Sequence, residues 1–249
     1  MLLKKWNKLP PQMQTAEVRK YYDILHKKRF SLLMKRVLDV VASLILLMIL
    51  SPLFLILAIA IKLDSKGPVF YRQIRVTQYG KRFRIFKFRS MVQRADEGSQ
   101  VTVGNDCRVT RVGKWVRRCR LDEISQLLDV LRGTMTLVGT RPEVPKYVES
   151  YTPEMMATLL LPAGVTSLAS IYYKDEAVLL KNADDVDKAY IQDVLPGKMY
   201  YNLKAIEKFS LWQDVRIMVM TVLAMLGKEY RDENVKPKIE EQTNEKINV

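Results

Sequence analysis

Residues 40–61 read VVASLILLMILSPLFLILAIAI, a continuous apolar stretch without a charged residue. A straight helix needs about 20 apolar residues to cross the hydrocarbon core of a bilayer. The stretch therefore predicts a membrane-embedded helix. It begins at Val40 after a long basic and polar segment, which is too late in the chain for a cleaved signal peptide.

Two features of this stretch argue against a simple transmembrane span. Ser51 and Pro52 lie in its middle, where proline removes a helical hydrogen bond and a serine hydroxyl can bond a preceding carbonyl. Basic residues flank both ends, so the positive-inside rule places both ends on the cytoplasmic face. A re-entrant helix that bends at Ser51-Pro52 satisfies both ends; a kinked spanning helix is the alternative. The flanking residues are Lys35, Arg36, Lys62, Lys66, Arg72 and Arg75.

Charge is distributed unevenly along the 249 residues, whose formal net charge is +14. Residues 1–36 hold 10 Lys and Arg against 2 Asp and Glu, and residues 62–120 hold 16 against 4. A basic excess on both sides of an apolar stretch favours an anionic membrane surface or phosphate-bearing substrates. No nucleic-acid-binding motif accompanies it, so we expect no nucleic-acid partner; a basic peripheral nucleic-acid binder would have no use for the apolar stretch.

The residue composition limits the kinds of fold and catalytic or metal site that the chain can form. A hydrophobic content of 48% supports a folded core. The chain has two cysteines and one histidine, which excludes a disulfide framework and the common zinc motifs. We expect Cys107 and Cys119 to be reduced thiols without a chemical role.

Periodicity predicts several elements. We expect a basic amphipathic helix over 15–30, either at the membrane interface or as a solvated extension, and a hairpin over 69–91 with one basic face. An amphipathic helix is expected over 109–131, a strand-like piece at 136–145, mostly helix over 147–208 and an apolar helix over 217–226, in the interface or on the domain. Residues 92–107 are expected to form a polar loop.

Adjacent carboxylates occur within the predicted 109–131 helix. Asp122 and Glu123 follow Arg117, Arg118 and Arg120. Both carboxylates can reach the boundary between the apolar and polar faces of the helix, where they can share a divalent cation. An ionised aspartate beside a phosphate-binding surface can act as a nucleophile. The alternative is a solvated, salt-bridged helix face.

Six motifs in order carry a family resemblance. Together they resemble the bacterial sugar transferases known as monotopic polyprenyl-phosphate phosphoglycosyl transferases, continuously from Lys35 to Pro145 and more weakly beyond. The motifs are KRVLDVVASLILLMILSP at 35–52, DSKGPVFYRQIRV at 64–76, FRIFKFRSM at 83–91, NDCRVTRVGKWVR at 105–117, LDEISQLLDVLRG at 121–133 and MTLVGTRPEVP at 135–145.

The resemblance implies a mainly helical α/β fold: a monotopic membrane protein with a re-entrant helix–break–helix at Ser51-Pro52, a basic β-hairpin and amphipathic interfacial helices. We expect an N-terminal basic extension at 1–34, the re-entrant helix at 35–62, a cytoplasmic catalytic domain at 63–227 and a charged, disordered tail at 228–249. The implied location is the cytoplasmic face of the bacterial inner membrane, in contact with its lipids. The sequence leaves the oligomeric state open, a homodimer included.

The resemblance also implies a reaction and a site. A nucleotide-diphosphate sugar, with UDP as the expected nucleotide, gives its sugar-1-phosphate to a polyprenyl phosphate such as undecaprenyl phosphate, releasing UMP and initiating a lipid-linked glycan or exopolysaccharide. By the same resemblance, Asp122 is the nucleophile and Glu123 helps to hold Mg²⁺. The implied phosphate contacts are Lys87, Arg89, Arg117 and Arg141.

The chain departs from the family pattern at several positions. Thr140 replaces the first proline of a Pro-Arg-Pro motif, and PAGVTSLAS at 162–170 lacks a glycine, a tryptophan and a glutamine found in relatives. Thr77 and Thr134 stand where glycine and aspartate are usual. A catalytically inactive membrane-bound interaction protein of the same fold is therefore the rival hypothesis.

Overall fold

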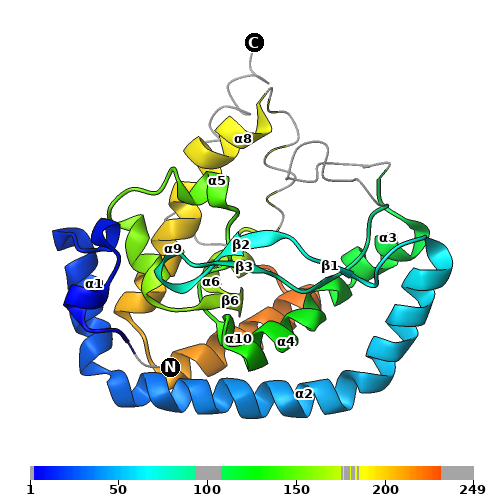
Figure 1. Ribbon diagram of the computed structural model, residues 1–249, viewed down its shortest axis with the longest axis horizontal. Coiled ribbons are helices and arrows are strands. Elements are labelled where there is room, and N and C mark those ends of the chain that lie inside the picture. Colours follow the sequence, from blue (N-terminus) through cyan, green and yellow to red (C-terminus); the bar gives the residue numbers. More distant parts are fainter. Residues whose placement is uncertain are drawn as a thin grey trace.

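The computed structural model describes residues 3–92, 108–174, 176, 180, 183 and 185–230. Within these residues the chain is mostly helical, with three short pairs of strands. The long helix α2 (Arg29–Asp64) runs beneath a body formed by the other elements, then turns upward at one side of it (Figure 1). The mainly helical content predicted from the sequence is confirmed. Two predicted segments lie outside the described residues: the polar loop, except for its first residue Val92, and the tail beyond Tyr230. Cys107 is in that loop and is also not described.

Helix α2 stays helical through Pro52 and bends near its middle (Figure 1). Pro52 cannot donate to the carbonyl of Met48, four residues earlier. The Ser51 hydroxyl donates to that carbonyl at 2.8 Å, as the sequence suggested. The predicted helix–break–helix is therefore one continuous, bent helix, because the serine compensates for the lost hydrogen bond.

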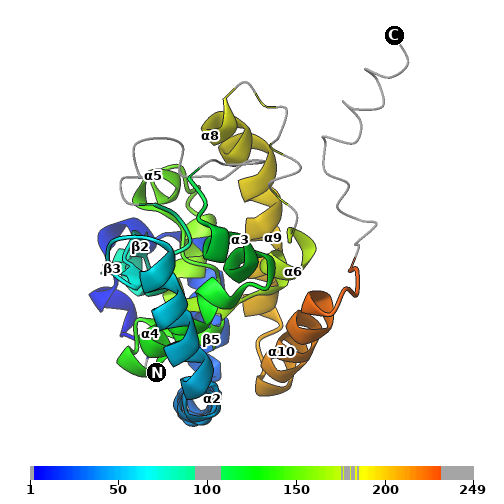
Figure 2. The same cartoon turned by 90° about the vertical axis from the view of Figure 1, so that its right-hand side faces the viewer.

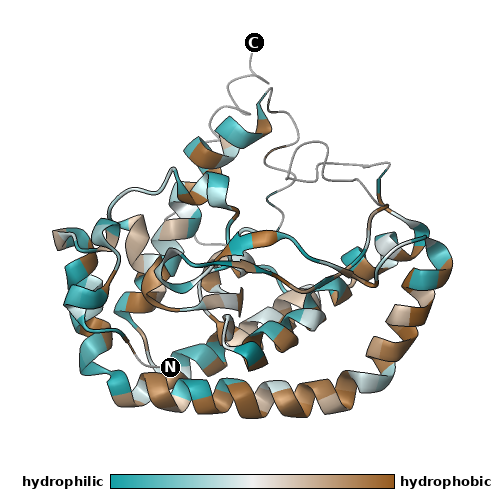
Figure 3. Cartoon of the chain, in the orientation of Figure 1, coloured by the Kyte–Doolittle hydropathy of each residue, from teal (hydrophilic) through white to brown (hydrophobic). Residues whose placement is uncertain are grey.

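The central part of α2 exposes many large apolar side chains, and Figure 3 shows it as the longest hydrophobic segment of the cartoon. A helix of this length and composition can enter a membrane. Such a continuous apolar surface on a soluble protein would favour aggregation or association. The exposed residues include Val37, Leu38, Val41, Leu44, Ile45, Met48, Ile49, Leu55, Ile56 and Ile59.

Both ends of α2 are attached to the same body. Near its start, Leu32 is fully buried in a core shared with helix α1 (Ala16–Lys27). Near its end, Leu57 and Ile61 pack against Phe88 and Val116. The two ends are therefore held on one body by separate apolar clusters.

Polar contacts reinforce the first attachment. Lys35 is buried and its ammonium lies 2.7 Å from Asp214 of helix α10 (Leu211–Met225). The Asp39 carboxylate accepts from the Thr136 hydroxyl at 2.5 Å and from the Leu137 amide at 3.2 Å. The buried ionic groups of α2 thus have partners in the body, while many apolar side chains of its central part are exposed.

The N-terminal segment belongs to the core. Val18, Tyr21, Tyr22 and Leu25 of α1 are buried in one cluster with residues of η5 (Met155–Leu160) and α9 (Leu195–Glu207). The apolar face of this amphipathic helix is therefore covered by the protein itself. Both sequence-based interpretations, an interfacial helix and a solvated extension, are wrong for this face.

The predicted hairpin is confirmed in two parts. Strands β2 (Ile74–Val76) and β3 (Arg82–Arg84) pair antiparallel, as do β1 (Phe70–Tyr71) and β4 (Lys87–Phe88). The expectation of one basic face is wrong. Arg75 lies opposite Phe83, whereas Arg82 and Arg84 lie opposite Val76 and Ile74. Because side chains alternate along a strand, Arg75 points away from the other two.

Strands β5 (Met135–Val138) and β6 (Ala163–Thr166) form a parallel pair. Strand β6 was missed, because residues 147–208 read as mostly helical. Gly139 and Gly164 pack closely, and a side chain at Gly164 would lie 2.2 Å from the Gly139 backbone. Thr77 and Thr134, two of the departures from the family pattern, are joined by a 2.6 Å hydrogen bond from the Thr77 hydroxyl to the Thr134 carbonyl.

Short helices and α9 complete the body. Helix α10 lies on the same lower side of the body as the first half of α2 (Figure 2), and it confirms the helix predicted over 217–226. Ile217 is buried, whereas Trp212, Val219, Val222 and Leu226 are exposed. Outside the candidate site, the described residues also form η1 (Trp6–Lys8), η2 (Pro11–Met13), η3 (Gln78–Gly80), α5 (Pro145–Val148), α6 (Leu168–Tyr172), α8 (Val186–Ala189) and η6 (Tyr190–Val194).

Candidate functional site

The predicted helix over 109–131 is interrupted where the site forms. Helix α3 (Arg111–Arg118) is followed by Cys119, a free thiol, and by Arg120, which adopts a left-handed conformation with φ of 52°. The 3₁₀ helix η4 (Leu121–Gln126) and helix α4 (Leu127–Arg132) follow. The expectation of one continuous helix is therefore wrong. The break places Asp122 and Glu123 in the first turn of η4.

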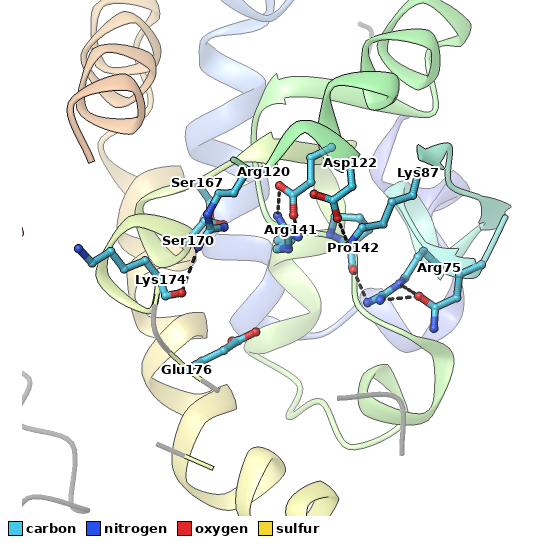
Figure 4. Close-up of polar contacts among 12 residues, drawn as sticks. Arg75, Lys87, Arg120, Asp122, Arg141, Pro142, Ser167, Ser170, Lys174 and Glu176 are labelled. Carbon is cyan, nitrogen blue, oxygen red and sulfur yellow. Dashed lines mark hydrogen bonds and ion pairs between the residues drawn. The ribbon is translucent and has the colours of Figure 1, made fainter. Parts of the chain in front are cut away.

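A cavity of about 330 Å³ opens beside this turn. Seven basic and four acidic side chains line it, so its walls carry an excess of positive charge that suits an anionic ligand. Figure 4 shows side chains from η4, the hairpin and the segment after β5 meeting here. The charged lining residues are Arg75, Lys87, Arg117, Arg120, Asp122, Glu123, Arg141, Glu143, Lys174, Glu176 and Lys198.

Asp122 is held beside Lys87. Its Oδ2 atom lies 2.9 Å from the Lys87 ammonium, and its side chain is 5% exposed. The Ser125 hydroxyl bonds the carbonyls of Phe86 and Asp122 at 3.1 and 3.2 Å, which ties η4 to the hairpin. The Asp122 Oδ1 atom makes no hydrogen bond with any described residue, which leaves one oxygen available to a ligand.

Glu123 forms a two-point ion pair with Arg141. The Arg141 Nη1 atom donates to Glu123 Oε2 at 3.0 Å, and Nη2 donates to Oε1. Burial by itself would raise the pKa of Glu123, but Arg141, Lys87 and Arg120 outweigh it and lower the pKa to about 2. The same pairing raises the pKa of Arg141. Both groups therefore stay charged at neutral pH.

This arrangement revises the expected carboxylate pair. Asp122 and Glu123 line one cavity, but each faces its own cation, Lys87 or Arg141. The part of the chain that the structure describes contains no cluster of three metal-ligating side chains. Mg²⁺ commonly takes one or two carboxylates together with substrate phosphates and water. The two carboxylates fit that donor set.

Acid should selectively remove the stability that Glu123 contributes. Its pKa is about 2 in the folded protein, below the usual 4.5, so this contribution is present above pH 4.5 and is lost as pH falls toward 2. We expect the wild type to lose more thermal stability than Glu123→Gln over that interval. Detergent-solubilised protein heated at several pH values measures this; parallel curves for the two proteins would contradict it.

Three further arginines line the cavity. The Arg117 guanidinium makes no hydrogen bond or ion pair with another described residue, so it is available to an anion. Arg75 bonds the Gln73 side chain at 2.6 and 3.0 Å and the Pro142 carbonyl at 3.1 Å. Arg120 donates to the Lys174 carbonyl at 3.1 Å. The structure thus places five of the six chemical residues predicted from the sequence around one cavity: Lys87, Arg117, Asp122, Glu123 and Arg141.

Arg89, the remaining predicted phosphate contact, lies elsewhere. It is 5% exposed and does not line the cavity. Its guanidinium donates to the Ser65 carbonyl at 2.6 Å and to the Ser65 hydroxyl at 2.9 Å. Arg89 lies just after the end of β4, and its guanidinium reaches the end of α2, whereas the Lys87 ammonium reaches Asp122 in the cavity. Its position is that of a structural residue.

Sequence reasoning missed the wall opposite Asp122. Glu143, Tyr190, Glu176 and Lys198 line the cavity and interact with one another. One signal was present: Glu143 follows Arg141 by only two residues, so a carboxylate lies close in sequence to a residue already assigned to the site. Lys198 and Tyr190 come from distant helices whose placement no local pattern indicates.

The comparisons with known proteins match the part of the chain that forms this cavity. The family model for bacterial sugar transferases matches residues 30–228. The chain belongs to the bacterial sugar transferase family. Residues 1–29, which include α1, lie outside the matched range, whereas all the cavity residues named above lie inside it.

Several relatives of this sugar transferase are similar to it over most of the chain. The UDP-N-acetylgalactosamine-undecaprenyl-phosphate N-acetylgalactosaminephosphotransferase of Aeromonas hydrophila is 38% identical over 196 residues, which is 77% of this chain and 43% of the relative. The exopolysaccharide production protein PSS of Rhizobium leguminosarum bv. phaseoli is 36% identical over 205 residues, 78% of this chain and 96% of the relative. The chain spans less than half the length of several relatives, 36% of the Komagataeibacter xylinus undecaprenyl-phosphate glucose phosphotransferase for example.

Proposed function

We propose that this sugar transferase moves a sugar-1-phosphate from a UDP-sugar to undecaprenyl phosphate and releases UMP, the first step in building a lipid-linked glycan or exopolysaccharide. The observation that carries the proposal is Asp122, held beside Lys87 with one free oxygen in a cavity with excess positive charge. The named reactions of relatives that are 38% and 35% identical support the substrate classes.

The proposed chemistry has two displacements at one phosphorus atom. An oxygen of Asp122 attacks the phosphorus bonded to the sugar, and the bridging phosphorus–oxygen bond breaks with its electron pair leaving on UMP. A phosphate oxygen of undecaprenyl phosphate then attacks the same phosphorus, releasing the Asp122 carboxylate and forming the diphosphate-linked lipid. Splitting the transfer suits two substrates that arrive from water and from the bilayer.

Positive charge is needed because a carboxylate and a diphosphate repel each other. Lys87 lies against Asp122, and Arg117 is free to contact phosphate oxygens, so these cations offset the repulsion and stabilise charge on the departing UMP. Mg²⁺ bound with the donor phosphates by Glu123 and Asp122 would supply further stabilisation of that charge. Arg141 keeps the Glu123 carboxylate ionised and oriented.

UMP release tests this function directly. The purified chain, incubated with magnesium and a panel of UDP-sugars, should release many equivalents of UMP per enzyme from at least one donor when undecaprenyl phosphate is in excess, and no more than one equivalent without it. Absence of UMP with every donor would instead support the inactive interaction protein.

We also propose that α2 is re-entrant and that the body lies on the cytoplasmic face of the inner membrane. The body contacts α2 at Leu32 near one end and at Leu57 and Ile61 near the other. A polar, folded body cannot sit on both sides of a bilayer, so both ends belong on one face. The bend at Pro52 and the basic flanks support the same topology.

Cysteine labelling tests this topology. Lys27 and Lys66 are exposed residues before and after the apolar stretch. Single cysteines there, in a background without Cys107 and Cys119, should both resist a membrane-impermeant thiol reagent applied to the periplasmic side and react after permeabilisation. Labelling of one site alone from outside would establish a spanning helix. Pro52→Leu should shift part of the population toward spanning, because it restores a straight helix.

A further inference from the structure

The wall of the cavity opposite Asp122 presents carboxylates, and the lysine beside them is fully engaged in contacts within the wall. Figure 4 shows Glu176 across the space from Asp122 and Arg141. Lys198, which is 4% exposed, bonds Glu176 Oε2 at 3.0 Å, Glu143 Oε1 at 3.3 Å and the Tyr190 hydroxyl oxygen at 2.7 Å. All three ammonium protons are therefore used within the wall, so Lys198 does not offer its charge to a phosphate.

Each carboxylate keeps one oxygen free. Glu143 is 6% exposed, and its Oε1 atom accepts from both Tyr190, at 2.6 Å, and Lys198. Glu143 Oε2 and Glu176 Oε1 make no hydrogen bond with any described residue. Burial by itself would raise the pKa of Glu143, but Lys198, Tyr190 and Arg75 outweigh it and lower the pKa below its usual value. An ionised carboxylate only accepts hydrogen bonds, so the wall offers acceptors.

The two walls therefore suit different halves of one ligand. Phosphates are favoured beside Lys87 and Arg117 and are repelled by the free oxygens of Glu143 and Glu176. Hydroxyl and amide N–H groups are hydrogen-bond donors, and the free carboxylate oxygens of this wall are acceptors for them. A sugar ring carries several such donors, whereas its phosphate carries none at neutral pH.

We infer that Glu143 and Glu176 bind the sugar of the nucleotide-sugar donor through its hydroxyl or amide groups, with Lys198 and Tyr190 as positioning residues. This assignment rests on the proposed function and adds the subsite that discriminates between sugars. Residues 141–143 contribute to both walls: the Arg141 guanidinium bonds Glu123, while the Glu143 carboxylate accepts from Lys198.

Equilibrium binding to Asp122→Asn protein, which cannot consume the donor, tests the assignment. UDP-sugar and UMP share the nucleotide, so only the former reports on the sugar. Glu143→Gln and Glu176→Gln should each weaken UDP-sugar binding about tenfold and leave UMP binding within about twofold, the effect of losing a charge-assisted hydrogen bond. Glu149→Gln, an exposed position outside the cavity, is the matched control and should change neither affinity.

The outcomes separate the two proposals. Unchanged UDP-sugar binding in both variants, or equal loss of UDP-sugar and UMP binding, would overturn the sugar assignment while UMP release by the wild type remained intact. Absence of UMP release from every donor would overturn the proposed function and the assignment together. Glu176 is 36% exposed at its side chain, so Glu176→Gln keeps the test valid if Glu143→Gln disturbs the buried network.

Discussion

Asp122→Asn should lower UMP release from a UDP-sugar by more than about 10³-fold, the scale expected when a covalent nucleophile is removed. The amide has nearly the shape of the carboxylate, so the fold should be kept. It is a poor nucleophile, however, and its pairing with Lys87, 2.9 Å away in the wild type, loses its ionic character. Initial rates of UMP formation at saturating donor and lipid phosphate measure the loss.

A matched aspartate supplies the control for this variant. Asp23 lies on the exposed side of α1, paired with Arg19 at 2.9 Å and outside the cavity. Asp23→Asn should leave turnover unchanged. Near-normal turnover by Asp122→Asn would mean that a direct transfer between donor and lipid phosphate replaces the two-step reaction.

Arg141→Lys should lower kcat/KM by about 10²-fold although the positive charge is kept. Lysine cannot reproduce the two-point contact with Glu123, and loss of two charge-assisted hydrogen bonds corresponds to about 3 kcal/mol. Steady-state kinetics over a range of donor concentrations measure the effect. Arg19→Lys changes a similar two-oxygen contact with Asp23 on an exposed surface and should have no effect. Equal activity of Arg141→Lys and wild type would remove Arg141 from the site.

The sequence predicted the membrane helix and the centre of the site because both depend on local patterns. An uncharged run with a central Ser51-Pro52 specifies a bent apolar helix, and the motifs that carry Lys87, Asp122, Glu123 and Arg141 indicate the site. The structure brings these residues to one cavity. The sequence motifs could not predict which cation each carboxylate pairs with inside the cavity, because that pairing depends on the left-handed turn at Arg120.

The errors arise where tertiary packing decides. An amphipathic helix such as α1 can cover a membrane or its own protein with the same face, and only the contacts of Tyr21 and Leu25 with η5 and α9 distinguish them. Arg89 lies only two residues from Lys87, but tertiary contacts separate their roles. Arg89 bonds Ser65 at the end of α2, whereas Lys87 reaches Asp122 in the cavity. The sugar-facing wall joins Glu143 to Lys198 across 55 residues.

Trapping the enzyme-bound sugar phosphate tests the proposed mechanism most directly. The chain is mixed with magnesium and a UDP-sugar labelled in its sugar, without lipid phosphate, and then denatured. We expect label bound covalently to wild-type protein, release of that label when undecaprenyl phosphate is added before denaturation, and no label on Asp122→Asn. Turnover by the wild type at a normal rate without any protein-bound label, or equal labelling of Asp122→Asn, would contradict the assignment of Asp122 as the nucleophile.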